Sequence, residues 1–521
     1  MRQFVNGRFL PCDGGEPFSV LVEKKGKIAY TGEEAPKAFA GAETIDLAGA
    51  CAVPSFGDTH LHFQSWAHVL GNLDVRSAQT LSEMETLVKN QEASRPGKPL
   101  IAFGCSAHTL QEQRLPTRAD LDAMTKTPLF MVKYDGHAAV ANSAMLDRLY
   151  RKVKGVPGFD ETSGWFYQDA FYKAADAVSR GVSPVELIQN IESAGIHLAE
   201  KGVSIFHAAE GMGYPMDLDV DLMRFSGRAL PQSVTTFFQT MAPEKVKRRG
   251  MRSVGGCFAN ALDGCFGSQD AALSKPYTHD PTNWGHLFYS QKEVDDFVMT
   301  AHELGLQVAL HAIGDAAVTQ ALNAFEKALI QSPRKDHRHI LIHGCLISSG
   351  DITRMADLGI TLAAQPPFLY WELEPQAYLD KILGDRSMQL MPFRALADAG
   401  VRMAGGSDAP TTLPDPMFSI WAACNHPNPN HSLSPMEALE MHTIRCAEAG
   451  FEEEERGSLS IGKRADFVVL DKDFLLTPKQ EIHTIQVVDH YLQGHRFSQK
   501  AVGALSFLGR ATFGRKRGAA L

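Results

Sequence analysis

Two histidines stand two residues apart, just after an apolar run, in the segment VPSFGDTHLHFQSW (residues 53–66). The apolar residues 53–56 are typical of the end of a buried strand, and alternate residues of a strand point to the same face. His60 and His62 can therefore reach one metal ion, for which imidazole is a common ligand. An isolated His-x-His pair also occurs at ordinary polar strand ends, so the hypothesis needs further ligands.

Three more polar side chains end apolar runs farther along the chain. LQVALHAIGD places His311 at such a position, HILIHG places His343 there, and VRMAGGSDAP ends on Asp408. The carboxyl ends of parallel barrel strands open on one face, where active sites lie. We expect these three side chains to converge with His60 and His62 as metal ligands. An ordinary buried histidine is the alternative for each one taken singly.

The elements that must position these residues alternate short β-rich runs with longer helical patterns. This alternation indicates βα units around a parallel sheet. We predict an α/β fold with a (β/α)8 barrel over residues 56–454. There are more than eight candidate strands, including KPLIAFGC and TPLFMVKYDG, so we place an insertion over about residues 64–195, covering the barrel mouth. A doubly wound open sheet is the alternative, which the lack of a GxGxxG or P-loop motif disfavours.

Both ends of the chain show short β patterns separated by glycine. EKKGKIAY resembles a hairpin with its turn at Lys-Gly, and GSLSIGKRADFVVLDKD near the other end has the same character. We predict a composite β-sandwich built from residues 1–55 and 455–498, followed by a C-terminal tail over residues 499–521.

Composition narrows the functional class. The chain has 521 residues, of which 44% are hydrophobic and 21% charged, as in ordinary globular proteins. Its 51 basic and 60 acidic residues give a net charge of −9, which argues against a nucleic-acid partner. The start has no apolar signal region, no run of about 18 apolar residues follows, and the eight cysteines form no CxxC motif. We expect a cytoplasmic protein with a small-molecule substrate and no membrane partner; homo-oligomerisation stays open.

The order His-x-His, His, His, Asp on successive strands resembles that of the amidohydrolase superfamily of metal-dependent hydrolases. The similar passages run from about residue 50 to 475 and include DTHLHF, KYDGHAAVANSAML, GVSIFHAAEG, LHAIGDAAVTQALNAFE, GGSDAP and ERGSLSIGKRADFVVLDKD. They are similar to the branch of N-substituted formamide deformylases. The resemblance implies a (β/α)8 barrel flanked by a β-sandwich and one or two divalent metals per chain. We expect zinc, with iron or manganese as alternatives.

One position departs from the family pattern. Many relatives carry a carboxylated lysine, which bridges two metals, about four residues before the DG of the fourth strand. Ala259 stands at this place in GGCFANALDGCFGS. We therefore predict a mainly mononuclear site, with His343 left to the substrate. A carboxylated Lys133 or a thiolate at Cys257 is the alternative as an additional ligand, although an ion-pair group and a small buried hydrophobe are the favoured interpretations.

The resemblance implies a hydrolase that cleaves a non-peptide C–N bond, in an amide or an N-substituted formamide, with a metal-activated water. Asp408 would take a proton from that water and pass it to the leaving group. His343 would either ligate a second metal or polarise the scissile carbonyl. The alternatives are a cyclic amidase or deaminase, a non-hydrolytic isomerase or decarboxylase, and a non-enzymatic binding protein with a degenerate site.

Further side chains are expected near the substrate. We place Asp135, His137 and His207 at the pocket, where the first two have loop fixation as their alternative and His207 would support a metal ligand. Aromatic residues near predicted loops point to an apolar substituent on the substrate, with core packing as the alternative; they are Phe63, Trp66, Phe166, Phe368, Tyr370 and Trp371.

Overall fold

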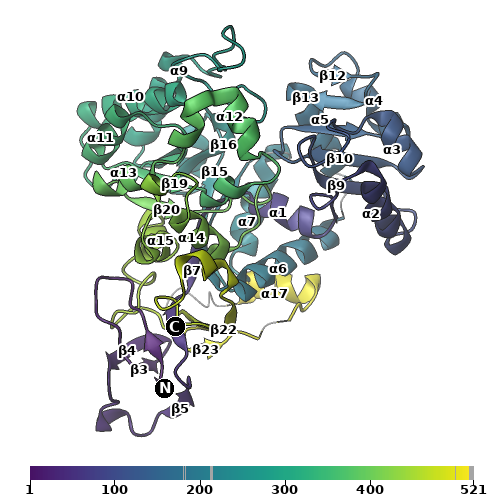
Figure 1. The fold of residues 1–521 in the computed structure, drawn as a ribbon. Helices are drawn as coiled ribbons and strands as arrows, with labels where there is room; N and C mark the ends of the chain where they lie inside the picture. The colour runs from purple at the N-terminus through teal and green to yellow at the C-terminus, as the bar shows by residue number, and fades with distance from the viewer. Residues whose placement is uncertain (180, 182, 212–214, 499, 515–521) are drawn as a thin grey trace.

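The computed structural model describes residues 1–179, 181, 183–211, 215–498 and 500–514. Its centre is an eight-stranded parallel sheet that curls into a nearly closed (β/α)8 barrel (Figure 1). The strands follow one another in chain order: β7 (Phe56–Leu61), β14 (Val203–Glu210), β15 (Ser233–Phe238), β16 (Ser253–Ala261), β17 (Gln307–Ala312), β18 (Ile340–His343), β19 (Thr361–Ala364) and β20 (Met403–Gly405). The predicted barrel is confirmed.

Hydrogen bonds beyond the strand ends join the first and last strands of the barrel. The backbone N–H of Asp408 donates to the carbonyl of His60, and the N–H of His62 donates to the carbonyl of Ala409, each at 2.8 Å. The barrel is therefore closed at the point where these candidate ligands leave strands β7 and β20.

Alternation along the strands separates two apolar cores. Val308 and Leu310 of β17 pack outward with the surrounding helices, whereas Ala309 belongs to the core inside the barrel. Helix α9 begins at a capping box between Ser290 and Glu293. The helices on the barrel side are α6 (Pro184–Glu200), α7 (Leu218–Ser226), α8 (Pro243–Arg248), α9 (Gln291–Glu303), α10 (Asp315–Gln331), α11 (Ser349–Leu358), α12 (Gln376–Leu383), α13 (Phe393–Asp398), α14 (Pro416–Cys424), α15 (Pro435–Met441) and α16 (Ile444–Ala449).

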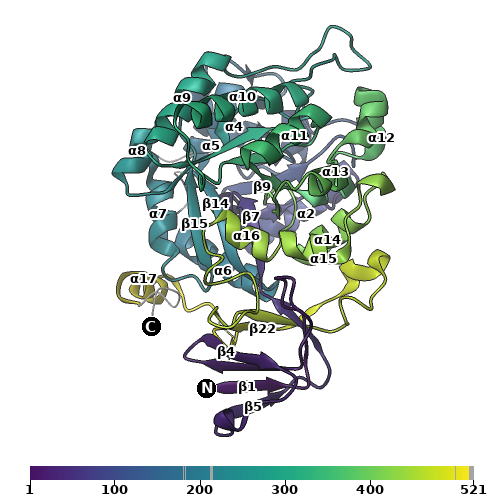
Figure 2. The same ribbon diagram turned by 90° about the vertical axis from the view of Figure 1, so that its left-hand side faces the viewer.

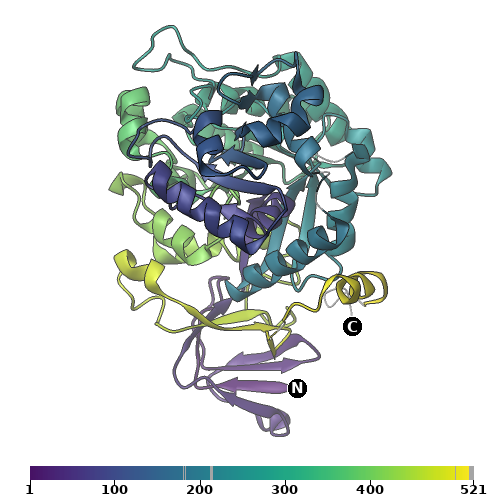
Figure 3. The ribbon, with the colours of Figure 1, turned by 90° about the vertical axis from the view of Figure 1, so that its right-hand side faces the viewer.

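A separate six-stranded sheet follows the first barrel strand and the short helix α1 (Phe63–Leu70). The predicted strands KPLIAFGC and TPLFMVKYDG are β9 and β10 of this sheet, not barrel strands. Figure 3 shows this blue segment in front of the barrel. Its elements are β8 (Leu73–Asp74), β9 (Leu100–Cys105), β10 (Leu129–Lys133), β11 (Ala138–Ala141), β12 (Phe159–Asp160), β13 (Trp165–Tyr167), α2 (Leu81–Ser94), α3 (Arg118–Met124), α4 (Ser143–Val153) and α5 (Gln168–Ser179).

Two further sheets lie together below the barrel (Figures 1 and 2). Residues Lys25 and Gly26, both with positive φ, turn the predicted hairpin between β3 and β4. Phe4 of one sheet packs against Phe467 of the other in a shared core. The first sheet contains β4 (Lys27–Gly32), β3 (Val20–Lys24), β1 (Arg2–Val5) and β5 (Glu43–Asp46); the second contains β2 (Arg8–Phe9), β6 (Cys51–Pro54), β21 (Phe467–Leu470), β22 (Val487–Leu492) and β23 (His495–Arg496).

The segment expected as a C-terminal tail includes helix α17 (Ala504–Phe513). Phe507 is fully buried, and the carboxylate of Glu192 on α6 accepts a hydrogen bond from the N–H of Gly503 at 3.1 Å. Residues 499 and 515–521 of this segment lie outside the described residues. The domain boundaries drawn from the sequence stay a prediction. In the described part of the chain, no helix has the length and apolar character needed to cross a bilayer.

A buried carboxylate ties the end of the barrel to the sheets below it. Asp466 Oδ2 accepts from Arg456 Nη1 at 2.9 Å and from Arg464 Nε at 2.7 Å. The substitution Asp466→Ala leaves buried cations without this anion, so we expect the free energy of unfolding to fall by about 3–5 kcal/mol. Urea unfolding followed by circular dichroism measures the change. The control Asp296→Ala, which removes an exposed pair with Lys292, should not shift the midpoint; equal midpoints for both variants would contradict the assignment.

Candidate metal centre

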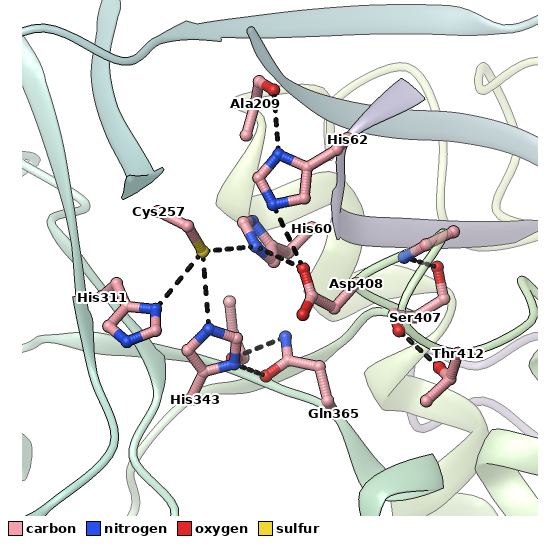
Figure 4. Close-up of polar contacts among 12 residues, drawn as sticks. His60, His62, Ala209, Cys257, His311, His343, Gln365, Ser407, Asp408 and Thr412 are labelled. Carbon is pink, nitrogen blue, oxygen red and sulfur yellow. Dashed lines mark hydrogen bonds and ion pairs between the residues drawn. The ribbon is translucent and has the colours of Figure 1, made fainter. Parts of the chain in front are cut away.

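The first group of candidate ligands combines residues from both edges of the barrel. His60 Nε2 and His62 Nε2 lie 3.1 and 3.3 Å from Asp408 Oδ1 (Figure 4). His62 Nδ1 lies 3.3 Å from the carbonyl of Ala209, which can only accept. An imidazole that donates from Nδ1 to this carbonyl leaves Nε2, on the side of the carboxylate, available to bind a metal.

A second group lies beside the first. Cys257 Sγ is 3.4 Å from His311 Nδ1 and 3.5 Å from His343 Nε2. The same sulfur is 3.2 Å from His60 Nε2, so it belongs to both groups (Figure 4). The structure thus brings together the five predicted ligands and Cys257, and it places His311 with His343 rather than directly beside Asp408. Which of them bind metal stays a prediction.

Backbone geometry explains why these side chains meet. His311 lies two residues after the inward-facing Ala309 and shares its face. Ile342 also faces inward, so simple alternation would turn His343 outward; instead, His343 adopts a φ of 71°. Asp408 adopts a φ of 56°. Such left-handed conformations are uncommon for residues other than glycine and cluster at functional sites.

Strand β16 is interrupted at the position of the expected lysine. Gly256 pairs with Leu310 of β17, but the next pair joins Ala261 to His311, so the residues between bulge out of the sheet. Counting about four residues back from the DG motif placed Ala259 at the ligand position, and that count takes no account of this bulge. Cys257 faces the histidines instead, next to Gly256.

The other predicted residues are divided between the cavity and its surroundings. Lys133 Nζ forms an ion pair with Asp135 Oδ2 at 2.5 Å and is not among the described residues that line the cavity. Asp135 and His137 line the cavity above the ligands. His207 is not among the described residues that line it; its ring packs against Phe237 inside the barrel.

The cavity has a volume of about 590 Å³ and lies between the barrel and the inserted sheet. Five residues of the ligand groups line it, namely His62, Cys257, His311, His343 and Asp408, and the remaining walls are mainly apolar. Of the aromatic residues singled out in the sequence, Phe368 and Trp371 line the cavity, whereas Phe63, Trp66 and Phe166 are buried in the hydrophobic cores. The inserted sheet and its helix α5 contribute Ile101, Phe103, Phe130, Val132, Phe171 and Tyr172.

Two functional positions escaped the sequence analysis. Gln365 Oε1 lies 2.7 Å from His343 Nδ1, while its Nε2 donates to the carbonyl of Ala363 at 3.1 Å. Glu210, on the cavity wall, accepts from the N–H of Gln64 at 3.1 Å. Its position at the end of β14 is the same signal that identified His311. Gln365 likewise follows the end of β19 (Thr361–Ala364), but its contact with His343 exists only in the folded protein.

Burial sets the charge state of the site. It lowers the pKa of His60 and of His311, and it lowers the pKa of His343 to about 4. These imidazoles are therefore neutral at pH 7, which is the form that binds metals. Burial and the nearby charge of Asp219 raise the pKa of Glu210 well above its usual range.

The donor set fits a divalent cation. Asp408 Oδ1 is buried and lies 3.1 Å from His60 Nε2 and 3.3 Å from His62 Nε2, so a carboxylate oxygen and two imidazole nitrogens converge on one place. Burying a carboxylate oxygen against the lone pairs of imidazole nitrogens costs free energy unless a cation lies between them. Neutral imidazoles with one carboxylate are ligands of catalytic sites for zinc and similar ions.

Comparison with known proteins decides the family. A model of the amidohydrolase family matches residues 43–496. The chain belongs to this family. The buried ligand groups and the family together identify it as a metal-dependent hydrolase of the amidohydrolase superfamily.

Among its relatives, this amidohydrolase is 27% identical to the N-substituted formamide deformylase of Arthrobacter pascens, over 90% of this chain and 93% of that protein. Two solved structures are also similar. An uncharacterized metal-dependent hydrolase from Pyrococcus furiosus is 28% identical with a TM-score of 0.74, over 91% of this chain and 99% of that chain. An uncharacterized metal-dependent hydrolase from Pyrococcus horikoshii OT3 is 26% identical with a TM-score of 0.76, over 92% of this chain and 99% of that chain.

Gln365 orients His343, a predicted ligand of this amidohydrolase, and provides a test of the metal centre. Gln365→Leu removes the acceptor that fixes His343, so we expect metal affinity to fall about 10- to 100-fold. Competition with a chromophoric chelator measures the affinity. Gln320→Leu is the control, because Gln320 is equally buried but donates to Tyr289 away from the site. Equal metal affinities in the two variants would contradict the role of Gln365.

Proposed function

We propose that this amidohydrolase cleaves the C–N bond of an amide or an N-substituted formamide carrying an apolar substituent. The observation that carries the proposal is the cluster of four buried imidazoles and one carboxylate beside an apolar cavity. The similarity to an N-substituted formamide deformylase supports the same bond type. We also propose that the substrate is a small molecule, since the cavity of about 590 Å³ has the size of small-ligand pockets.

Each side chain of this cluster has an assigned task. A bound divalent ion would supply Lewis-acid activation of water and of the scissile carbonyl. Asp408 directs Oδ1 to His60 and His62, and we assign its Oδ2 as the atom that accepts the proton of the attacking water and passes it to the leaving nitrogen. His343 lies with Cys257 and His311, so we assign it to metal binding rather than to the carbonyl.

The walls exclude water and favour an apolar group. Phe368 stacks on His343 with ring centroids 5.9 Å apart, and Trp371 stacks on Phe368 at 5.2 Å. Apolar surface that leaves water on binding contributes about 0.8 kcal/mol for each methylene. The idea of a degenerate binding protein depended on Ala259, and the presence of Cys257 in the cluster weakens it.

A series of N-alkyl formamides tests the reaction and the substituent together. We expect kcat/KM to rise about fourfold per added methylene, because 0.8 kcal/mol corresponds to that factor, until the cavity is full. Formate release measures the rate, and ¹⁸O from labelled water should appear in the acid product. Turnover without ¹⁸O uptake would favour a non-hydrolytic enzyme, and rates independent of chain length would exclude the apolar site.

Asp408→Asn tests the proton transfer. The amide keeps the shape and one ligand oxygen, so we expect the variant to retain its metal while kcat falls about 10²- to 10⁴-fold. Metal analysis and steady-state kinetics measure the two quantities. Asp351→Asn is the control, since Asp351 is also buried but pairs with Arg354 on α11, outside the cavity. An Asp408→Asn variant with full turnover would refute the assigned role.

A further inference from the structure

We propose that Cys257 is a bridging ligand whose thiolate joins two divalent ions in one centre. One ion would lie with His60, His62 and Asp408, and the other with His311 and His343. This inference deepens the proposed function and rests on it, and it replaces the expectation of a single ion that followed from Ala259. Binding releases the thiol proton to solvent and leaves the sulfur as an anion.

Cys257 is the residue that the two ligand groups share. His60, His62, Cys257 and Asp408 offer ligand atoms within 4.8 Å of one another, and Cys257, His311 and His343 do the same. Their relative exposed fractions are all below 9%, so the groups lie away from bulk water.

The hydrogen bonds around the histidines point their lone pairs at the sulfur. His311 Nε2 lies 3.3 Å from the carbonyl of Gly264, so its proton is on Nε2 and its Nδ1, which faces Cys257, is bare. His343 Nδ1 donates to Gln365 Oε1, so the Nε2 that faces Cys257 is also bare.

A thiol is a poor partner for this arrangement. It has one proton, and three imidazole nitrogens lie within 3.5 Å of the sulfur, at least two of them bare. An S–H group can satisfy one of these nitrogens and leaves another facing the sulfur electron pairs. A cation on each side of a Cys257 thiolate would accept the lone pairs of the sulfur and of the imidazole nitrogens that face it.

Charge leads to the same assignment. Two dications about 3.5–4 Å apart repel strongly, and a negative ligand between them offsets that repulsion. Lys133, the alternative bridging residue, is paired with Asp135 and is not among the described residues that line the cavity. Thiolates bind zinc and related soft or borderline ions well.

The backbone of β16 delivers the sulfur to this place. A Cβ on Gly255 would lie 1.8 Å from the carbonyl oxygen of Ala309, so only glycine allows β16 to approach β17 so closely just before Cys257. Phe258, the next residue, has a φ of 48° and begins the bulge. Bulges beside active sites re-aim side chains, which here turns Cys257 toward the barrel axis.

Cobalt substitution tests the bridge independently of activity. The full-length protein is stripped of metal, reloaded with Co²⁺ and examined for thiolate-to-Co²⁺ charge-transfer absorption in the near ultraviolet, together with metal content per chain. We expect about two equivalents of metal and a clear charge-transfer band. With Zn²⁺, X-ray absorption should show a sulfur scatterer at about 2.3 Å.

Variants separate a bridge from a terminal ligand. Cys257→Ser should abolish the band and lower the content to about one equivalent or less. His62→Ala and His311→Ala should each lose about one equivalent yet keep a charge-transfer band, because the sulfur serves both positions. The matched control is Cys12→Ser: its buried thiol donates to the carbonyl of Leu10, and a hydroxyl can replace it, so band and metal content should be unchanged.

Other outcomes overturn the bridge. These are saturation at one equivalent, a band that persists in Cys257→Ser, or two equivalents retained by a folded Cys257→Ala variant. Failure of the bridge leaves the proposed function intact if the enzyme still hydrolyses the formamide series. Conversely, a two-ion centre with the thiolate charge-transfer band but no amide hydrolysis would refute the proposed function and leave the bridge intact.

Discussion

The rest of this structure depends on one constraint: the imidazole nitrogens, the Cys257 sulfur and the Asp408 carboxylate direct their lone pairs at one buried place. A different acceptor fixes each of three imidazoles: the carbonyl of Ala209, the carbonyl of Gly264 and the side chain of Gln365. Each acceptor lies at or just beyond the end of a barrel strand other than the one that carries its histidine. The parallel barrel therefore supplies both the predicted ligands and the groups that orient them.

The hydrogen bonds that close the barrel help to hold the strained backbone conformations of the predicted ligands. His343 and Asp408 hold left-handed backbone conformations, which an isolated strand end would not keep. Bonds between β7 and the segment after β20, such as that from the N–H of Asp408 to the carbonyl of His60, determine this geometry from both sides. Asp58 adds to the closure by accepting from the N–H of Ser407.

The sequence predicts the parts of this site that follow regular rules. His311 could be identified because it ends an apolar strand before a helix, and the barrel followed from the alternation of strands and helices. The bulge in β16 breaks the period of two, so counting residues indicated Ala259 instead of Cys257. Gln365 acts through its distance to His343 across neighbouring strands, and that pairing exists only in the folded protein.

The inserted sheet lets the lining of the cavity change in evolution separately from the predicted metal ligands. Most of its buried apolar residues form cores of their own, around Met131 and around Phe130, whereas Phe103 packs in the core around the barrel; none of those described belongs to the core inside the barrel that contains Cys257. Phe130 and Phe171, which line the cavity, belong to one of these separate cores. Mutations there can reshape the chamber without moving a strand that carries a ligand. After gene duplication, one copy can thus change its substrate specificity while the predicted metal-binding residues and their chemistry stay the same.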